Sequence, residues 1–380
     1  MAMFGVGVVM APIIGPTLGG WLTDSYSWRW VFYINIPVGL AAIAMTRVFI
    51  FDPPYLKRES TGIDYWGIGL LAIGIAALQI VLDKGQEDDW FGSRFITTLA
   101  VISVAGLAAF IVRELRTRHP VVHLRVFKIP TYAAGVFLMT MLGFVLYGSM
   151  VLLPIFLQTL LGYPAMDAGI AMFPRGFGSF LAMPLVGVII ARADPRKMLA
   201  LGFATASLTL FQLSWLNLNA GYWNIFWPQF IQGVSMALIF VPLTTATMAP
   251  IAREEMGNAT SLFNLLRNVG GSAGIAVSNT YLFRRQQMHT SLLVGHVSPY
   301  SLHANAILQA LRGALTAKGS DAVTALHQAY GMMWGMVERQ AAMISFVDTF
   351  RLMGLIFLLM LPLLLVMRRP AHGGGAPPMH

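Results

Sequence analysis

Residues 11–20 read APIIGPTLGG and lie within an apolar segment that covers residues 1–22. Glycine or proline recurs about every four residues there, and this spacing destabilises a helix in water. In a membrane such helices are tolerated, because neighbouring helices supply the hydrogen-bond partners that the backbone loses. The segment therefore predicts a helix that is packed inside a membrane protein.

The composition of the 380-residue chain supports this interpretation. Hydrophobic residues make up 57% of it and charged residues only 11%, and there is no cysteine. A bilayer core needs about 20 apolar residues in a helix. We expect ten such spans, at residues 1–22, 30–50, 64–83, 95–113, 132–158, 168–191, 198–216, 224–248, 258–283 and 347–367. The prediction is an all-α polytopic membrane protein without disulfides or thiolate metal sites.

The distribution of basic residues predicts the orientation. If residue 1 is cytoplasmic, most Lys and Arg fall in inner loops, and the short outer loops hold only Arg29, Lys84 and Arg94. Because cytoplasmic loops are enriched in Lys and Arg, both termini are expected in the cytoplasm. Topology then accounts for the net charge of +9, and no nucleic-acid partner is expected.

The loops divide the chain into parts. We expect two helices, then a polar linker with one helical hairpin, then six helices with a large outer loop, then a flexible cytoplasmic tail. These parts cover residues 1–50, 51–131, 132–367 (outer loop 284–346) and 368–380. In the outer loop, apolar residues at three- and four-residue spacing within Ala304–Leu315 and Ala322–Arg339 predict a small helical cap.

A second motif, WRWVFYINIP at residues 28–37, follows the first. Together they closely resemble the antiporter motif of helix 5 and the start of helix 6 in the drug:proton antiporters of the major facilitator superfamily, of the fourteen-helix EmrB/QacA type. The resemblance continues through LDKG at 82–85, WPQFIQG at 227–233 and the long outer loop. It implies the major facilitator fold, incomplete here, with about ten of fourteen helices.

By this resemblance, residues 1–50 are a remnant of the N-terminal bundle (helices 5 and 6), and the hairpin within 51–131 forms helices 7 and 8. Helices 1–4, which carry an acidic residue, a charged loop and an arginine linked to proton handling in the family, have no counterpart. We therefore expect an N-terminally truncated product or a decayed gene. A non-transporting remnant or membrane scaffold stays open as the alternative function.

The resemblance implies multidrug efflux: antiport of amphipathic or cationic compounds out of the cytoplasm, by alternating access, in the inner membrane. The proton gradient supplies the energy and no cofactor is implied. A periplasmic adaptor and an outer-membrane channel are implied partners, with loop 284–346 as the docking surface. An enzyme is disfavoured, because no HExxH, GxSxG or paired carboxylates occur within a span and the histidines, such as His289, are expected in loops or tails.

The small residues of the first motif predict close helix packing, because backbone approach is a main packing device in lipid. Gly7, Ala11, Gly15 and Gly19 would share the packed face. We interpret the motif as a seal between the two bundles, with simple tight packing as the alternative. The motif residues are Ala11, Pro12, Gly15, Pro16, Gly19 and Gly20.

A charged turn between two expected spans resembles the second-half copy of the family's loop between helices 2 and 3. The resemblance implies that this turn is a gating loop that is remade as the bundles rock, and ordinary anchoring by positive residues is the alternative. Its residues are Gly187, Asp194, Arg196 and Lys197.

Ionisable residues inside spans are the sharpest signals, since a charge at the bilayer centre costs about 2.5–3.5 kcal/mol on insertion scales. Arg175 and Arg267 are such residues, and we expect them to face the bundle interior or a water-filled cavity, with a structural ion pair or a hydrogen bond to helix carbonyls as the alternative. Asp348 and Arg351 are expected to pair on one helix face.

Polar, aromatic and methionine residues in the last six helices are candidates for a polyspecific substrate path, because such surfaces accept many shapes. The alternative is that they face lipid or pack between helices. Gln229 stands where the first-half copy of its motif has an arginine, which argues against a proton-linked charge there. The candidates are Tyr147, Met150, Gln158, Met172, Gln229, Gln232, Asn264 and Asn268.

Overall fold

The computed structural model describes residues 15–49, 64–117, 122–190, 193–298 and 300–365. Within these ranges all regular structure is helical, and seven helices are long and apolar enough to cross a membrane. They cover Trp30–Phe49, Tyr65–Lys84, Arg94–Arg116, Pro130–Thr159, Ala165–Ile189, Tyr222–Met248 and Ala322–Leu364. The predicted class, an all-α polytopic membrane protein, is confirmed.

Two further expected spans are also helical in the structure, but they are not among the seven helices that are long and apolar enough to cross a membrane. They are α8 (Pro195–Leu213) and the 39-residue α10 (Met256–Val294). Of the first expected span, only residues 15–22 are described, and they lie in a helix that continues to residue 25. The short α2 (Trp30–Tyr33) and α3 (Asn35–Phe49) follow.

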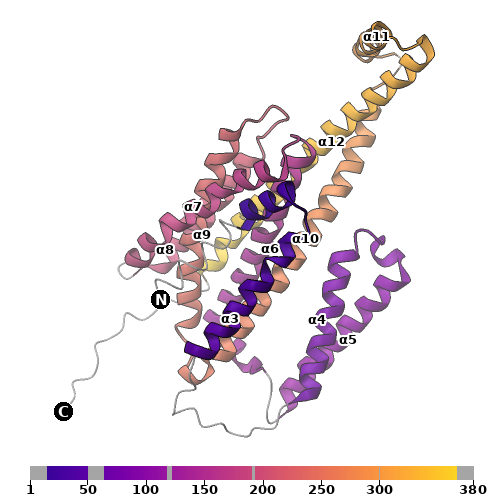
Figure 1. Ribbon diagram of the computed structural model, residues 1–380. Helices are drawn as coiled ribbons and strands as arrows, with labels where there is room; N and C mark the ends of the chain where they lie inside the picture. The colour runs from indigo at the N-terminus through magenta and orange to yellow at the C-terminus, as the bar shows by residue number, and fades with distance from the viewer. Residues whose placement is uncertain (1–14, 50–63, 118–121, 191–192, 299, 366–380) are drawn as a thin grey trace, which may run out of the picture.

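The C-terminal bundle contains the main core. It is formed by α6 (Pro130–Thr159), α7 (Ala165–Ile189), α8, α9 (Tyr222–Met248), α10 and α12 (Ala322–Met360). Helices α6 and α10 form one close pair, and α7 and α9 form another (Figure 1). Large apolar side chains such as Tyr132, Phe203 and Phe357 fill the space between the helices.

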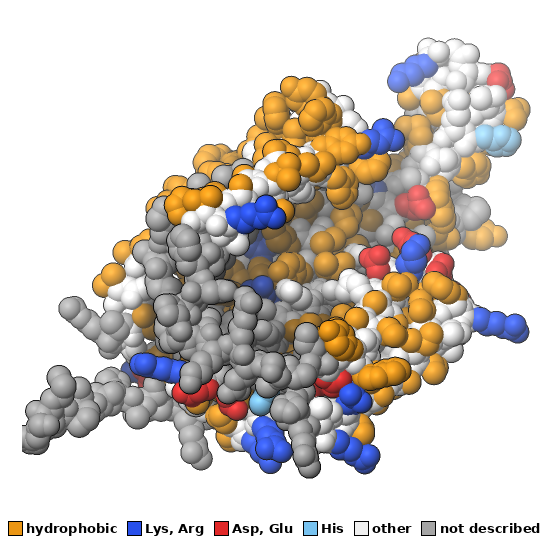
Figure 2. Space-filling model, turned by 60° about the horizontal axis from the view of Figure 1, so that its bottom comes forward, with side chains coloured by type: hydrophobic (Ala, Val, Ile, Leu, Met, Phe, Trp, Pro, Cys, Tyr) orange, Lys and Arg blue, Asp and Glu red, His pale blue; other side chains and the backbone are white. Residues whose placement is uncertain are grey.

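Glycines allow the close approach within these pairs. Gly270 and Gly274 on α10 lie against the backbone of Thr140 and Phe144 on α6, where any Cβ would clash. In lipid there is no hydrophobic drive between helices, so such backbone contacts stabilise the bundle largely through van der Waals packing. Many large hydrophobic side chains are also exposed, as contact with lipid requires, and Figure 2 shows hydrophobic side chains on one face together with charged and polar ones.

The hairpin of α4 (Tyr65–Lys84) and α5 (Arg94–Arg116) lies beside α10 (Figure 1). Gly74 and Gly106 bring its helices together, and the Ser103 hydroxyl donates to the Gly74 carbonyl at 3.0 Å. At the end of the hairpin opposite its connecting turn, Arg113 donates to both carboxylate oxygens of Asp64 at 2.7–2.9 Å. Asp64 directly precedes α4. Asp64 also caps α4 by accepting from the Gly67 amide at 3.0 Å.

We expect Asp64→Asn to loosen this end of the hairpin. The Arg113 guanidinium and the Gly67 amide lower the pKa of the Asp64 carboxyl below its ordinary value of 3.8. A lowered folded-state pKa stabilises the fold above the ordinary value, and this contribution is lost as the pH falls through the lowered pKa. Amide hydrogen exchange in the first turn of α4 should therefore be faster in Asp64→Asn at neutral pH, and should approach wild type in strong acid. Equal protection of both proteins at neutral pH would contradict the pair's role, and Asp88→Asn, in the opposite turn, is the control.

The outer loop 284–346 does not form the separate helical cap that the sequence predicted. It is helical, as expected, but α10 and α12 run through its ends without a break, and only α11 (Leu302–Ala317) is a separate helix. At 1.5 Å per residue, helices of 39 residues are about 58 Å long, far beyond a bilayer core of about 30 Å. The α10–α12 pair therefore projects from the bundle and carries α11 at its tip (Figure 1). The last span, expected to start at 347, begins as part of a helix that starts at Ala322.

Candidate functional site

Arg175 sits at a close contact between α7 and α9. Gly233 on α9 packs directly on the Arg175 carbonyl, and Gly178 on α7 packs on the Phe230 carbonyl. The Ser179 hydroxyl donates to the Gly233 carbonyl at 2.8 Å. These small residues fix the position of Arg175 in the bundle, because no larger side chain would fit between the two backbones.

The Arg175 side chain is only 8% exposed. Its Nη2 lies 3.5 Å from the Ser149 hydroxyl of α6, and in the described ranges no carboxylate forms an ion pair with it. Burying a charge without a counter-charge is costly. Arg175 thus lies in the interior of the bundle and forms no ion pair among the described residues. Its role in transport stays a prediction.

Two buried amides lie on the adjoining stretch of α9. Gln229 and Gln232 are 1% and 0% exposed, and Gln229 Nε2 donates to Gln232 Oε1 at 3.5 Å. Gln229 Oε1 and Gln232 Nε2 have no hydrogen-bond partner among the described residues. Met172, one turn before Arg175 on α7, is also buried. The α6–α7–α9 contact therefore holds a guanidinium and two amide groups that still have hydrogen-bonding capacity.

The α6–α10 pair holds a second set of candidates. Arg267 is half-buried, and its carbonyl packs on Gly143. Its Nε is buried and has no hydrogen-bond partner in the part of the chain that the structure describes. The Tyr147 ring lies over Gly271. The Asn264 amide donates to the Thr260 carbonyl of its own helix at 3.0 Å, so that donor is already used.

The remaining path candidates are not gathered with these groups. Met150 is half-buried and packs on the core, whereas Gln158 and Asn268 are exposed. Exposure of these two polar side chains does not support an enclosed path through them. Their role in transport stays a prediction.

The motif helix, residues 15–25, packs on the start of α7. The Thr17 hydroxyl donates to the Gly169 carbonyl at 3.4 Å, and Asp24 Oδ2 accepts from the Met166 amide at 2.7 Å. Gly20 lies against the Ala165 carbonyl, and the Pro16 carbonyl lies against Gly169. The motif therefore contacts the helix that carries Arg175.

The packed face differs from the expected one. A Cβ at Gly15 or Gly19 would meet nothing within 4 Å among the described residues, so close approach occurs through Gly20 instead. The helix is rotated so that Pro16 and Gly20 face α7. Gly7, Ala11 and Pro12 lie outside the described residues, and the seal stays a prediction.

The charged turn after α7 acts locally as a helix cap. Asp194 Oδ1 accepts from the Arg196 amide at 3.0 Å and so caps α8. Lys197 is exposed. Within the described residues, Arg196 Nε is buried and has no hydrogen-bond partner, and a Cβ at Gly187 would meet nothing within 4 Å. The contacts fit anchoring as well as gating, and residues 191–192 lie outside the described residues.

A cluster that the sequence did not indicate joins α10 to α12. His289 Nε2 lies 2.9 Å from Asp348 Oδ2, and Arg285 Nε lies 3.5 Å from the same oxygen. Arg351 is 3.9 Å from Asp348 Oδ1, so the expected Asp348–Arg351 pair is part of this larger group. The expectation that His289 lies in a loop is wrong, because α10 continues through it. In the described ranges no three His, Asp or Glu side chains are placed to hold a metal ion.

Comparison with known proteins connects these features to a family. The sequence profile of the Major Facilitator Superfamily matches residues 1–275, which include the motif helix, the hairpin and most of the C-terminal bundle. The chain belongs to the major facilitator superfamily. Its fold is accordingly that of a membrane transporter, and no part of the family match indicates an enzyme.

Individual relatives of this superfamily member align along nearly the whole chain. Fatty acid resistance protein FarB of Neisseria gonorrhoeae is 35% identical over 99% of the chain and 72% of the relative. Multidrug export protein EmrB of Escherichia coli K12 is 33% identical with the same coverage. Colistin resistance protein EmrB of Acinetobacter baumannii is 27% identical over 94% of the chain and 69% of the relative. The predicted EmrB-type family is thereby confirmed.

Proposed function

We propose that this protein exports amphipathic or cationic small molecules from the cytoplasm in exchange for protons. The observation that carries the proposal is the buried polar group of α7 and α9. Among the described residues, Arg175 has no paired carboxylate, and Gln229 and Gln232 each have an amide atom without a hydrogen bond. Such groups are costly in a membrane bundle unless a ligand satisfies them. The similarity to proteins named for multidrug export and fatty acid resistance supports the same function.

The chemistry of the buried group fits an amphipathic compound. The guanidinium can donate to an acceptor or anionic group of the compound, the amides can bond to a donor or an acceptor, and the Met172 side chain with the surrounding apolar core can contact its hydrophobic body. Methionine adapts its shape to different partners, which suits a transporter with several substrates. The contact of the motif helix with α7 supports a seal that opens and closes by alternating access.

The remaining parts of the proposal concern orientation and energy. Both termini would lie in the cytoplasm and the protein in the inner membrane, as the positive-inside pattern indicates. The α10–α12 extension with α11 would then project outward and is the surface proposed for a periplasmic adaptor and an outer-membrane channel. The proton gradient would drive export without a cofactor.

An efflux assay tests the function. The complete gene, expressed in cells that lack their own exporters, should lower the accumulation of amphipathic dyes and raise resistance to a panel of amphipathic drugs and fatty acids. Collapse of the proton gradient by an ionophore should remove the effect. Unchanged accumulation across the panel, with the protein present in the membrane, would reject export. Export that persists without the gradient would reject the proton coupling but not the export itself.

A further inference from the structure

A polar crevice separates the hairpin from the C-terminal bundle. It has a volume of about 70 Å³ and lies between the end of α4 and the middle of α10. Eight side chains line it, five of them polar: Gln79, Leu82, Asp83, Gln86, Ser272, Ile275, Ala276 and Asn279. Pockets for drug-sized ligands measure about 300–1,000 Å³, so this crevice suits a small group and not a whole drug molecule.

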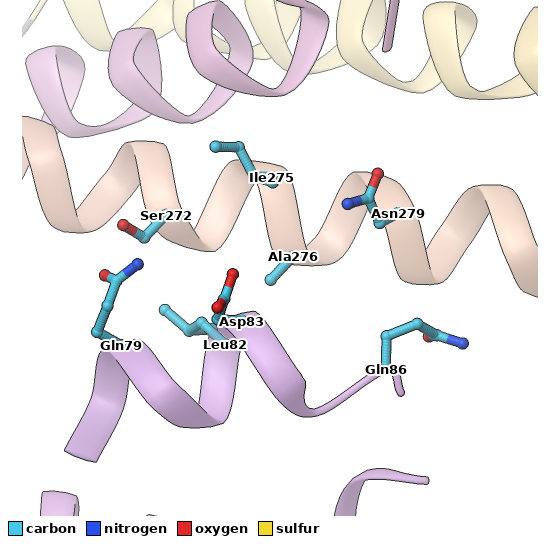
Figure 3. A pocket seen from close by; sticks show the side chains of 8 residues that line it. All are labelled: Gln79, Leu82, Asp83, Gln86, Ser272, Ile275, Ala276 and Asn279. Atoms are coloured by element: carbon cyan, nitrogen blue, oxygen red, sulfur yellow. The ribbon is translucent and has the colours of Figure 1, made fainter. Parts of the chain in front are cut away.

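The polar side chains come from two facing surfaces. Gln79 and Asp83 are four residues apart on one face of α4, and Gln86 follows just beyond the helix end. Ser272 and Asn279 are seven residues apart on one face of α10, with Ala276 between them. Figure 3 shows Gln79 and Asp83 directed toward α10, with the short Ala276 side chain opposite Asp83.

The crevice offers one carboxylate, which only accepts hydrogen bonds, and amide and hydroxyl groups that both donate and accept. Among the described residues no side chain forms a hydrogen bond or ion pair with Asp83. The Ser272 hydroxyl donates to the Asn268 carbonyl at 3.3 Å, and the Gln86 oxygen accepts from the Trp90 indole at 3.4 Å. The carboxylate, the hydroxyl oxygen and the amide oxygens of Gln79 and Asn279 can all accept further bonds. With no Lys or Arg in the lining, the crevice is complementary to a small cation that donates several hydrogen bonds.

Its place relative to the membrane indicates the source of that cation. Asp83 lies at the end of α4 opposite the Asp64–Arg113 pair, at one end of a spanning helix, where lipid headgroups meet the protein. Exposed Ile73 and Ile80 on α4 lie toward the membrane interior and can contact acyl chains. Lys84, the next residue after Asp83, is exposed and can approach a phosphate.

We propose that this crevice binds the primary ammonium group of phosphatidylethanolamine and that the bound lipid bridges α4 and α10. The ammonium of this lipid donates three hydrogen bonds and carries a positive charge. Phosphatidylcholine has the same charge on its headgroup nitrogen but no N–H donor, so it cannot donate to the Asp83 carboxylate or to an amide oxygen beside it. The crevice therefore discriminates between two lipids that differ only in methylation. This lipid site is independent of the proposed export.

Native mass spectrometry of the purified full chain tests the proposal. The protein would be titrated with equimolar phosphatidylethanolamine and phosphatidylcholine that have identical acyl chains. We expect wild type to retain phosphatidylethanolamine preferentially. Asp83→Asn should reduce the preference about tenfold, as loss of charge-assisted hydrogen bonds predicts. Glu87→Gln removes an exposed acid of the same turn that does not line the crevice, and should leave the preference unchanged.

A second variant acts from the other helix. Asn279→Leu removes an acceptor on α10 and should reduce the preference while Asp83 remains. Equal retention of the two lipids by wild type, or an unchanged preference in Asp83→Asn, would overturn the proposal. Tetraphenylphosphonium, a hydrophobic cation without N–H donors, serves as the competitor: failure to displace the lipid supports recognition of an ammonium donor. Displacement that depends on Asp83 would show that the crevice selects charge alone, against the proposal.

Discussion

Arg175→Ala is expected to abolish export while the protein still accumulates in the membrane. The guanidinium is buried and, in the described part of the chain, its contact is the Ser149 hydroxyl at 3.5 Å. A hydrogen bond between this charged group and the substrate would contribute about 1.5–3 kcal/mol. The loss of that bond should weaken substrate binding by about 10- to 150-fold. Efflux of an amphipathic dye and resistance to the most strongly exported drug would measure the effect.

The effect of Arg175→Ala on stability distinguishes a loss of transport from a loss of folding. Removing an unpaired charge from a spanning helix removes an insertion cost of about 2.5–3.5 kcal/mol, so the variant should reach normal membrane levels. Arg116→Ala, which removes an exposed arginine at the end of α5, is the matched control and should export normally. Normal export by Arg175→Ala would remove Arg175 from the substrate site.

Gly274→Leu is expected to prevent the C-terminal bundle from packing. Gly274 lies against the Phe144 carbonyl and Cα on α6, so an added side chain would collide with backbone that cannot rotate away. Overpacking a tight contact costs about 1–3 kcal/mol, occasionally more. The α6–α10 pair is a central contact of the bundle. Separation of these two helices should therefore destabilise the whole bundle. The variant should melt at a lower temperature in detergent and reach lower levels in the membrane.

The same helix supplies a control for this prediction. Gly257 lies in the first turn of α10, and a Cβ there would meet no atom within 4 Å, so Gly257→Leu should melt like wild type. Equal melting of Gly274→Leu and wild type would mean that α6 and α10 do not approach closely at this point. Gly270→Leu, one turn away against Thr140, should repeat the loss.

The hydropathy and small-residue patterns predicted several elements well. The hairpin and the C-terminal helices appear near the expected positions, and Arg175 is buried as a charge in a span should be. The helical character of the long outer loop also followed from its spacing of apolar residues. These features depend on neighbours three or four residues away, which periodicity reports directly.

Other parts of the site depend on contacts that no local pattern encodes. His289 and Asp348 are 59 residues apart and meet only because α10 and α12 extend together beyond the bundle. The face of the motif helix is set by α7, more than 140 residues later, so Gly20 makes the close contact that spacing had suggested for Gly15 and Gly19. The crevice likewise requires α4 to lie beside α10.

The sequence by itself therefore determined that the chain crosses a membrane in helices, because in lipid each backbone must form its hydrogen bonds within its own segment. It also indicated residues such as Arg175, whose charge is costly to insert into a membrane and is therefore expected to have a function. Only the tertiary structure decided which face of each helix meets a neighbour. Helix rotation and pairing follow from close backbone approach between segments far apart in the chain, and that fit exists only once the helices are assembled.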